Sequence, residues 1–245
     1  MDKQNNKRKR RISVTLIILL IAAIGIGAYL LDYYPPSETA MNQLEELTDS
    51  VQIVRGNNMI SFVPDDARIG IIFYPGGKVA YESYAPLMEL CGENGILCVL
   101  LHMPANLAVL DQNAAEGIRE LYPQVQKWYL AGHSLGGTVA AIYLSDHAKE
   151  FEGLILLASY STADLSDTKL KVLSVYGSED GVLNRKAYEE NRDMLPEDYK
   201  EVIIEGGCHA YFGSYGEQSG DGTPTITPQE QQRQTAQEII NFLYP

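Results

Sequence analysis

The sequence has few of the residues that support redox or metal chemistry. Its 245 residues include three cysteines and four histidines, and neither a CxxC nor an HExxH pattern occurs. An odd and sparse set of cysteines predicts no disulfide framework, and no His, Cys or Asp grouping has the spacing of metal ligands. The glycine-rich stretches match neither a phosphate-binding loop nor a dinucleotide fingerprint. We therefore expect neither a metal nor a cofactor.

Basic residues are scarce over most of the chain. Six of the 19 lysines and arginines lie in residues 1–11 beside one of the 32 acidic residues, which leaves 13 basic against 31 acidic residues, a net charge of −18. Proteins that bind nucleic acid need clustered Lys and Arg to neutralise phosphates. An acidic body without a basic stripe argues against nucleic acid as a partner, so we expect none.

Charge is also missing from residues 12–31, ISVTLIILLIAAIGIGAYLL. Twenty helical residues span about 30 Å, the thickness of the hydrocarbon core of a bilayer. The preceding basic residues predict a transmembrane anchor with its N-terminus in the cytoplasm and the rest of the chain outside. A cleaved signal peptide is the alternative, but the run is long and no A-x-A site follows it. The predicted parts are a basic cytoplasmic segment 1–11, the anchor 12–31, a stalk 32–49 and a globular domain 50–245.

From about residue 50 onward, apolar strands alternate with helices. Uninterrupted runs of Ile, Val and Leu are typical of strands buried on both faces of a parallel sheet. A hairpin turning at 56–58 makes the sheet mixed. We predict an α/β fold with a mostly parallel, doubly wound sheet and helices on both faces. The other predicted strands are 68–77, 96–101, 127–132, 153–159, 171–177 and 199–207, and the predicted helices are 84–95, 111–121, 135–148, 184–194 and 228–243.

One strand end has the pattern G-x-S-x-G, formed by residues 132–136. Ser134 lies there between a predicted strand and a predicted helix, the context of a nucleophile elbow, where a Cβ in place of the glycines would clash. The helix N-terminus also directs backbone N–H groups, including that of Leu135, toward a developing oxyanion. We interpret Ser134 as a nucleophile, the alternative being a turn that merely needs small residues.

A serine nucleophile needs a histidine base within reach. In the chain order of this kind of site, the base follows both the serine and the acid, and only His209, directly after the last strand, satisfies that order. His133 lies inside the elbow and is expected to pack away from the reacting face. His102 precedes the serine and is expected to be structural, and His147 is expected to cap a helix C-terminus or to be solvated.

The acid should follow another strand end between the serine and the base. The stretch VLSVYGSEDGVL offers Asp180, in a G-x-x-D-G turn, and Glu179 as the alternate. A second oxyanion donor should come from the loop after the strand 68–77. There a backbone N–H of Gly77 or Lys78 is expected to point inward.

These strand ends resemble the α/β-hydrolase superfamily, most of all a small bacterial branch related to dienelactone hydrolases that includes membrane-anchored forms. The resemblance covers residues 50–243 and rests on YPGGKVAYESYAPLMELC, AGHSLGGTVAA, VYGSEDGVL and GGCHAYFG. It implies Ser134 as nucleophile, Asp180 as acid, His209 as base, and backbone donors at Leu135 and Gly77. Pro75 stands where many members have His, and no long cap domain is visible.

The sequence predicts the substrate pocket less specifically than it predicts the catalytic residues. Only residues 159–170 separate two strands where many lipases insert a lid, which predicts a shallow, open pocket for a small or medium acyl substrate. In the loop 206–227, the aromatic residues Tyr211, Phe212 and Tyr215 either wall the pocket or tie down a surface loop. Cys208 beside the base is more simply a buried small residue than a thiol nucleophile.

The function predicted from these residues is that of an anchored serine hydrolase acting on esters or related acyl compounds. A catalytically silent α/β-hydrolase scaffold that binds at the cell surface is the main alternative. A membrane-surface lipase is a third reading, disfavoured by the missing lid and by the repulsion between the acidic domain and anionic headgroups. The oligomeric state is left open.

Overall fold

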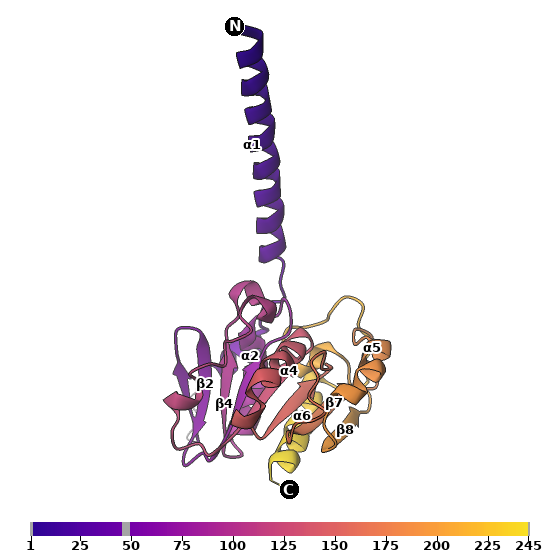
Figure 1. The fold of residues 1–245 in the computed structure, drawn as a ribbon. Helices are drawn as coiled ribbons and strands as arrows, with labels where there is room; N and C mark the ends of the chain where they lie inside the picture. Colours follow the sequence, from indigo (N-terminus) through magenta and orange to yellow (C-terminus); the bar gives the residue numbers. More distant parts are fainter. Residues whose placement is uncertain (1, 46–49, 245) are drawn as a thin grey trace. The chain divides into compact units, whose positions relative to one another are not determined.

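The computed structural model describes residues 2–45 and 50–244, except for the side chains of residues 2–14, 23 and 28. The chain divides into two compact units, residues 1–33 and residues 34–245. The first unit contains the helix α1, Asp2–Leu31 (Figure 1). Among the described residues, no helix is both long enough and apolar enough to cross a bilayer. The transmembrane segment predicted for residues 12–31 is therefore not found, and its first three side chains lie outside the described residues.

The second unit is built around one eight-stranded sheet with the order β1-β2-β4-β3-β5-β6-β7-β8. The β1-β2 hairpin is antiparallel, β2 pairs antiparallel with β4, and all other pairs are parallel. The predicted mostly parallel sheet with an opening hairpin is confirmed. The strands are β1 Val51–Arg55, β2 Met59–Pro64, β3 Ile69–Tyr74, β4 Ile96–Leu101, β5 Lys127–His133, β6 Gly153–Leu157, β7 Lys171–Gly177 and β8 Tyr199–Ile204.

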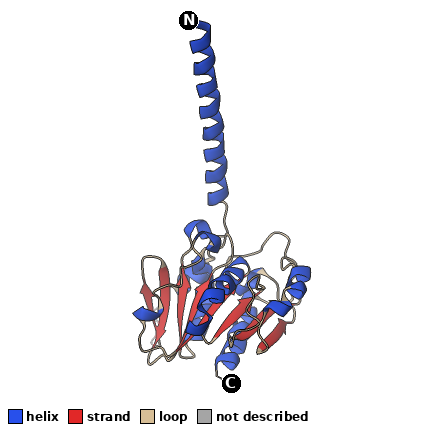
Figure 2. Cartoon of the chain, viewed as in Figure 1, coloured by secondary structure: helices blue, strands red, loops and turns tan. Residues whose placement is uncertain are grey.

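Helices cover both faces of this sheet, as the uninterrupted apolar strands predict (Figures 1 and 2). The helices are α2 Glu38–Gln43, α3 Ala85–Gly92, α4 Leu135–His147, α5 Arg185–Glu190 and α6 Pro228–Leu243, with short 3₁₀ turns between them. Alternate residues of one strand point to opposite cores. Ile71 packs in the core with α3 and α6, and Ile72 in the core with α4.

Three of the predicted helices differ from the structure. The predicted helix 84–95 is shorter, because α3 ends at Gly92 and a turn follows at 93–95. Residues 111–121 form successive turns that end in a 3₁₀ turn, Arg119–Leu121, rather than a helix. Gly117 has φ +77°, a left-handed conformation that an α-helix cannot contain. The predicted helix 184–194 is shorter, because α5 ends at Glu190 and a 3₁₀ turn follows.

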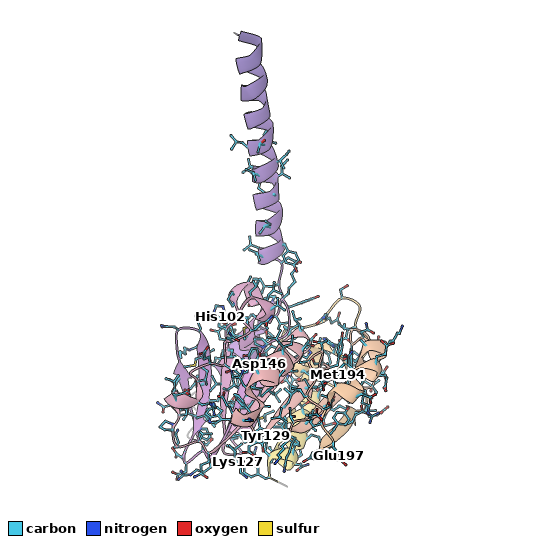
Figure 3. All side chains as sticks on the ribbon, in the orientation of Figure 1. His102, Lys127, Tyr129, Asp146, Met194 and Glu197 are labelled. Carbon is cyan, nitrogen blue, oxygen red and sulfur yellow. The ribbon has the colours of Figure 1, made fainter. Side chains whose placement is uncertain are left out.

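The chain reverses its direction of travel across the sheet at β3, which has β4 on one side and β5 on the other. In open α/β sheets, ligands bind beyond the carboxyl ends of the strands at such a switch point. Figure 3 distinguishes the two edges: Lys127 begins β5 at the amino end, and His102 follows β4 at the carboxyl end. The candidate site residues come from loops at the carboxyl edge.

Candidate active site

Ser134 lies at the sharp turn between β5 and α4. Its backbone has φ 50° and ψ −125°, a strained conformation for a residue with a side chain. The turn is held because the Ser134 N–H donates to Leu157 O (2.9 Å) and the Ser134 carbonyl accepts from Ser159 Oγ (2.7 Å). Although serine at a helix N-cap commonly caps the helix with its hydroxyl, the Ser134 side chain makes no capping hydrogen bond. The turn thus presents a hydroxyl that the helix does not use.

The glycines around Ser134 are required by close backbone contacts. A Cβ at Gly132 would lie 2.5 Å from the carbonyl carbon of Gly136, and a Cβ at Gly136 would lie 2.2 Å from Tyr74 O. The second contact shows that the start of α4 packs directly on the end of β3. The loop that follows β3 is thereby brought beside the turn that carries Ser134.

His209 and Asp180 form a buried pair at the ends of β8 and β7. The His209 Nδ1–H donates to Asp180 Oδ2 at 2.9 Å, and both side chains are almost completely buried. The other carboxylate oxygen accepts from the N–H groups of Val182 (2.9 Å) and Leu183 (2.7 Å), which fixes the orientation of the carboxylate. Glu179, the alternate acid, is exposed. The structure therefore pairs His209 with Asp180.

The bond to Asp180 places the lone pair of a neutral His209 ring on Nε2. This atom is buried, and no described residue forms a hydrogen bond with it. Ser134 Oγ is therefore not bonded to it in this structure. His209 and Ser134 nevertheless line one cavity of about 270 Å³. Its lining is otherwise uncharged and consists of Leu135, Thr138, Ala158, Ser159, Tyr160, Val182, Leu183 and Asn184. The structure thus brings Ser134 and the histidine of the His–Asp pair to a single cavity.

The structure rules out one of the two alternatives for the second oxyanion donor. The Lys78 N–H donates to Asn106 O at 2.7 Å, so this alternative is wrong. A Cβ at Gly77 would lie 3.0 Å from the Leu135 side chain, which places the Gly77 backbone beside the start of α4. Leu135 is the first residue of α4, where N–H groups have no partner within the helix.

The remaining histidines lie outside the cavity. His102 is exposed, with its ring centroid 4.8 Å from that of Tyr81 (Figure 3). His147 Nδ1 forms a hydrogen bond with Tyr143 O at 2.8 Å and so caps the C-terminus of α4. Capping is one of the two roles expected for His147, the other being a solvated side chain. His133 is buried below Ser134 and does not line the cavity, as expected.

Asp221 is a polar residue of the site that the sequence reasoning missed. Its Oδ1 accepts from the N–H groups of Gly181 and His209 at 3.1 Å, and its Oδ2 accepts from the N–H of Ala210 at 2.8 Å. It therefore ties the turn after Asp180 to the backbone of His209. The available signal was an aspartate between two glycines in the loop that follows the base, since such residues bond to backbone N–H groups.

The pKa of Asp221 predicts how it stabilises the fold. Burial raises this pKa, but the N–H groups of Ala210, Gly181 and His209 together outweigh burial and hold it below its ordinary value. A depressed carboxyl pKa adds stability above the pKa of the unfolded chain, and this stability is lost as the pH falls through the folded pKa. We expect Asp221→Asn to lower the free energy of unfolding at pH 7 by about 2 kcal/mol.

Urea unfolding of the full chain between pH 7 and pH 3 checks this expectation. The difference between wild type and Asp221→Asn should shrink as the pH falls below the ordinary carboxyl pKa, because the unfolded chain then binds a proton that the folded state, with its lower Asp221 pKa, does not yet bind. Asp146→Asn, at an exposed position of α4 (Figure 3), is the control and should show little change. A difference that is equal at both pH values would contradict a role for the charge.

The aromatic residues of the loop 206–227 are anchored in the core. Phe212 and Tyr215 are buried in the core with α3 and α6, and Tyr211 packs against that core. None of the three lines the cavity beside Ser134. Of the two interpretations, the structure supports a loop tied down by its aromatics.

Cys208 is buried and is held through its backbone by Gln231, which accepts from its N–H and donates to its carbonyl. Burial, with a smaller contribution from the charge of Asp221, raises the pKa of the Cys208 thiol to about 12. A thiol with this pKa has almost no thiolate at neutral pH and is a poor nucleophile.

Comparison with known proteins identifies the family. The sequence model of the alpha/beta hydrolase family matches residues 70–234, which is more than half of the chain, so the chain belongs to this family. No curated protein matches it.

Solved structures with low identity share the fold. A predicted CIB-like hydrolase from Thermoplasma acidophilum is 18% identical, with a TM-score of 0.56 over 78% of this chain and 98% of its own. A dienelactone hydrolase from Anabaena variabilis is 14% identical, with a TM-score of 0.58 over 79% and 97%. Est1E from Butyrivibrio proteoclasticus is 13% identical, with a TM-score of 0.58 over 80% and 100%.

Proposed function

We propose that this alpha/beta hydrolase is a serine hydrolase that cleaves an ester or related acyl bond, with Ser134 as nucleophile, His209 as base and Asp180 as the acid that orients the base. One observation carries the proposal. His209 donates from Nδ1 to the buried Asp180 carboxylate at 2.9 Å and keeps Nε2 unpaired, in a cavity that it shares with Ser134. A histidine held in this tautomer is suited to accept a proton from a hydroxyl.

The reaction follows from these positions. Ser134 Oγ attacks the acyl carbonyl carbon while its proton passes to His209 Nε2, and the oxyanion accepts from the N–H groups of Leu135 and Gly77. The protonated His209 then gives this proton to the leaving oxygen or nitrogen. Water, deprotonated by His209, attacks the acyl-enzyme, and His209 then returns this proton to Ser134 Oγ as the acid is released. Asp180 stays ionised and stabilises the imidazolium that forms twice in this cycle.

The cavity supports an uncharged acyl group of small or medium size. Its volume is about 270 Å³, and its lining contains no aspartate, glutamate, lysine or arginine. Apolar contacts come from Leu135, Val182 and Leu183. A carboxylate or phosphate on the acyl side would find no cationic side chain among these lining residues and would lose its hydration.

Covalent labelling of the full chain with a fluorophosphonate tests the proposal. We expect one adduct, mapped to Ser134 by mass spectrometry, and no adduct in Ser134→Ala or His209→Ala. Ser145→Ala is the matched control, because Ser145 lies on the exposed face of the same helix and should not affect labelling. Folded wild-type protein that forms no adduct would contradict an activated serine and would favour a silent binding scaffold.

A further inference from the structure

A buried chain of hydrogen bonds ends at His209, one of the residues that line the cavity. The Gly76 N–H donates to the Tyr84 hydroxyl at 3.0 Å, this hydroxyl contacts His133 Nδ1 at 2.8 Å, and His133 Nε2 contacts the carbonyl oxygen of His209 at 3.1 Å. The side chains of Tyr84 and His133 are 0% and 1% exposed, so water does not compete for these bonds. The chain joins residues at or after the carboxyl ends of three strands, β3, β5 and β8.

The groups at the two ends of this chain, the Gly76 N–H and the His209 carbonyl, determine where each proton between them lies. The His209 carbonyl can only accept, so His133 Nε2 bears a proton and donates it. The Tyr84 oxygen accepts from Gly76, and its single proton is donated to His133 Nδ1. A doubly protonated His133 would reverse that last bond and leave the buried Tyr84 proton without an acceptor. The hydrogen bonds therefore select a neutral His133.

The surroundings favour the same neutral form. Burial lowers the pKa of His133 well below its ordinary value, and the charge of His209 makes a smaller contribution in the same direction. The ring centroids of His133 and His209 are only 4.6 Å apart. During the proposed reaction His209 becomes positively charged, and a second positive charge at this distance would oppose that step. A neutral His133 avoids this repulsion.

Each residue held by the chain adjoins one part of the proposed machinery. Gly76 precedes the oxyanion donor Gly77, His133 precedes the nucleophile Ser134, and the third partner is the backbone of the base itself. A Cβ at Gly76 would lie 2.8 Å from both His133 Nδ1 and the Tyr84 oxygen, so this arrangement also requires glycine at 76.

Given the proposed function, we infer that Tyr84 and His133 are positioning residues, which hold the oxyanion loop, the nucleophile and the base in one geometry through this chain. Neither side chain lines the cavity, so both act through the residues that they hold. Loss of a link should disturb the transition state more than the binding of substrate.

Tyr84→Phe in the full chain tests the central link. We expect kcat for 4-nitrophenyl acetate and the rate of fluorophosphonate labelling of Ser134 to fall roughly tenfold, because Gly76 N–H and His133 Nδ1 lose their partner. KM should stay within about twofold of wild type, since the cavity lining is unchanged. All rates are measured below the unfolding temperature of every variant.

Tyr74→Phe is the matched control. The Tyr74 hydroxyl is equally buried and also has two partners, donating to Gln112 O (2.9 Å) and accepting from Ala115 N–H (3.1 Å). Within the described part of the chain, no hydrogen bond joins this hydroxyl to His133. Tyr74→Phe should therefore lose comparable stability and retain kcat. If both variants lose activity equally, or if neither does, the inference is overturned.

A second pair of variants covers the case in which Tyr84→Phe does not fold. His133→Gln keeps an N–H donor for the His209 carbonyl, whereas His133→Leu has similar size without one. A role in hydrogen bonding predicts higher kcat for Gln, and a role in packing alone predicts that Leu is at least as active.

Ring ¹⁵N signals of the four histidines in wild type give a readout independent of activity, and at pH 7 His133 should bear its proton on Nε2 alone. A proton on Nδ1 would overturn the inference. Wild type that fails to label would refute the proposed function instead. Wild type that labels normally beside an unaffected Tyr84→Phe would refute only the positioning role.

Discussion

Ser134→Ala should lower kcat for any substrate that the protein hydrolyses by roughly 10⁵-fold or more, because Ser134 is the proposed nucleophile and the neighbouring hydroxyls of Thr138 and Ser159 donate to backbone carbonyl oxygens. In the structure, the Ser134 hydroxyl does not cap α4. Its removal should therefore leave the fold nearly unchanged, apart from the small cost of alanine at φ 50°.

Steady-state hydrolysis of 4-nitrophenyl acetate, together with thermal unfolding, checks this expectation. Binding of a non-hydrolysable ester analogue should persist in the variant, because the cavity keeps its shape. Residual turnover within about tenfold of wild type would contradict nucleophilic catalysis by Ser134 and would point to direct attack by water.

Asp180→Asn should lower kcat by roughly 10⁴-fold, although aspartate and asparagine have the same shape. Asp180 Oδ1 accepts from the N–H groups of Val182 and Leu183, so the amide oxygen of asparagine will occupy that position. The amide NH₂ will then face His209 and donate to Nδ1. His209 consequently takes the tautomer with its proton on Nε2 and cannot accept the proton of Ser134.

Glu179→Gln is the matched control for the acid. It removes a neighbouring carboxylate that is exposed. Within the described part of the chain, the Oε1 of Glu179 accepts a hydrogen bond only from Ser178 Oγ, at 3.1 Å. Its kcat should stay within about twofold of wild type. Equal losses in Asp180→Asn and Glu179→Gln would mean that the turn is sensitive to any change, and the specific role of Asp180 would be contradicted.

Strands were predicted more reliably than helices, for a physical reason. A strand buried on both faces must be apolar throughout, so the run Ile96–Leu101 identifies β4 without reference to the rest of the fold. Residues 111–121 have a pattern that resembles a helix. Their conformation instead depends on the positive φ of Gly117 and on Tyr74, whose hydroxyl bonds to Gln112 and Ala115 from β3.

For the candidate site, the pattern predicted which residue types meet but not every contact. The order of strand ends singled out Ser134, Asp180 and His209, since parallel strands bring their carboxyl ends to one edge. The choice between Gly77 and Lys78 could not be made, because it depends on Asn106, which lies on a different loop. Asp221 and Tyr84 were missed for the same reason.

The sequence by itself determined the class of fold, the strand ends at which the chemistry is proposed, and the residue types at those ends. These features follow from local apolar patterns and from glycines that no other residue can replace. Only the tertiary structure decided that His209 pairs with Asp180 and that the Lys78 N–H donates to the carbonyl oxygen of Asn106. It also decided that the aromatic residues of the loop 206–227 pack in the core. Each of those outcomes depends on contacts between residues far apart in the chain, which compete for the same few buried hydrogen bonds and the same space.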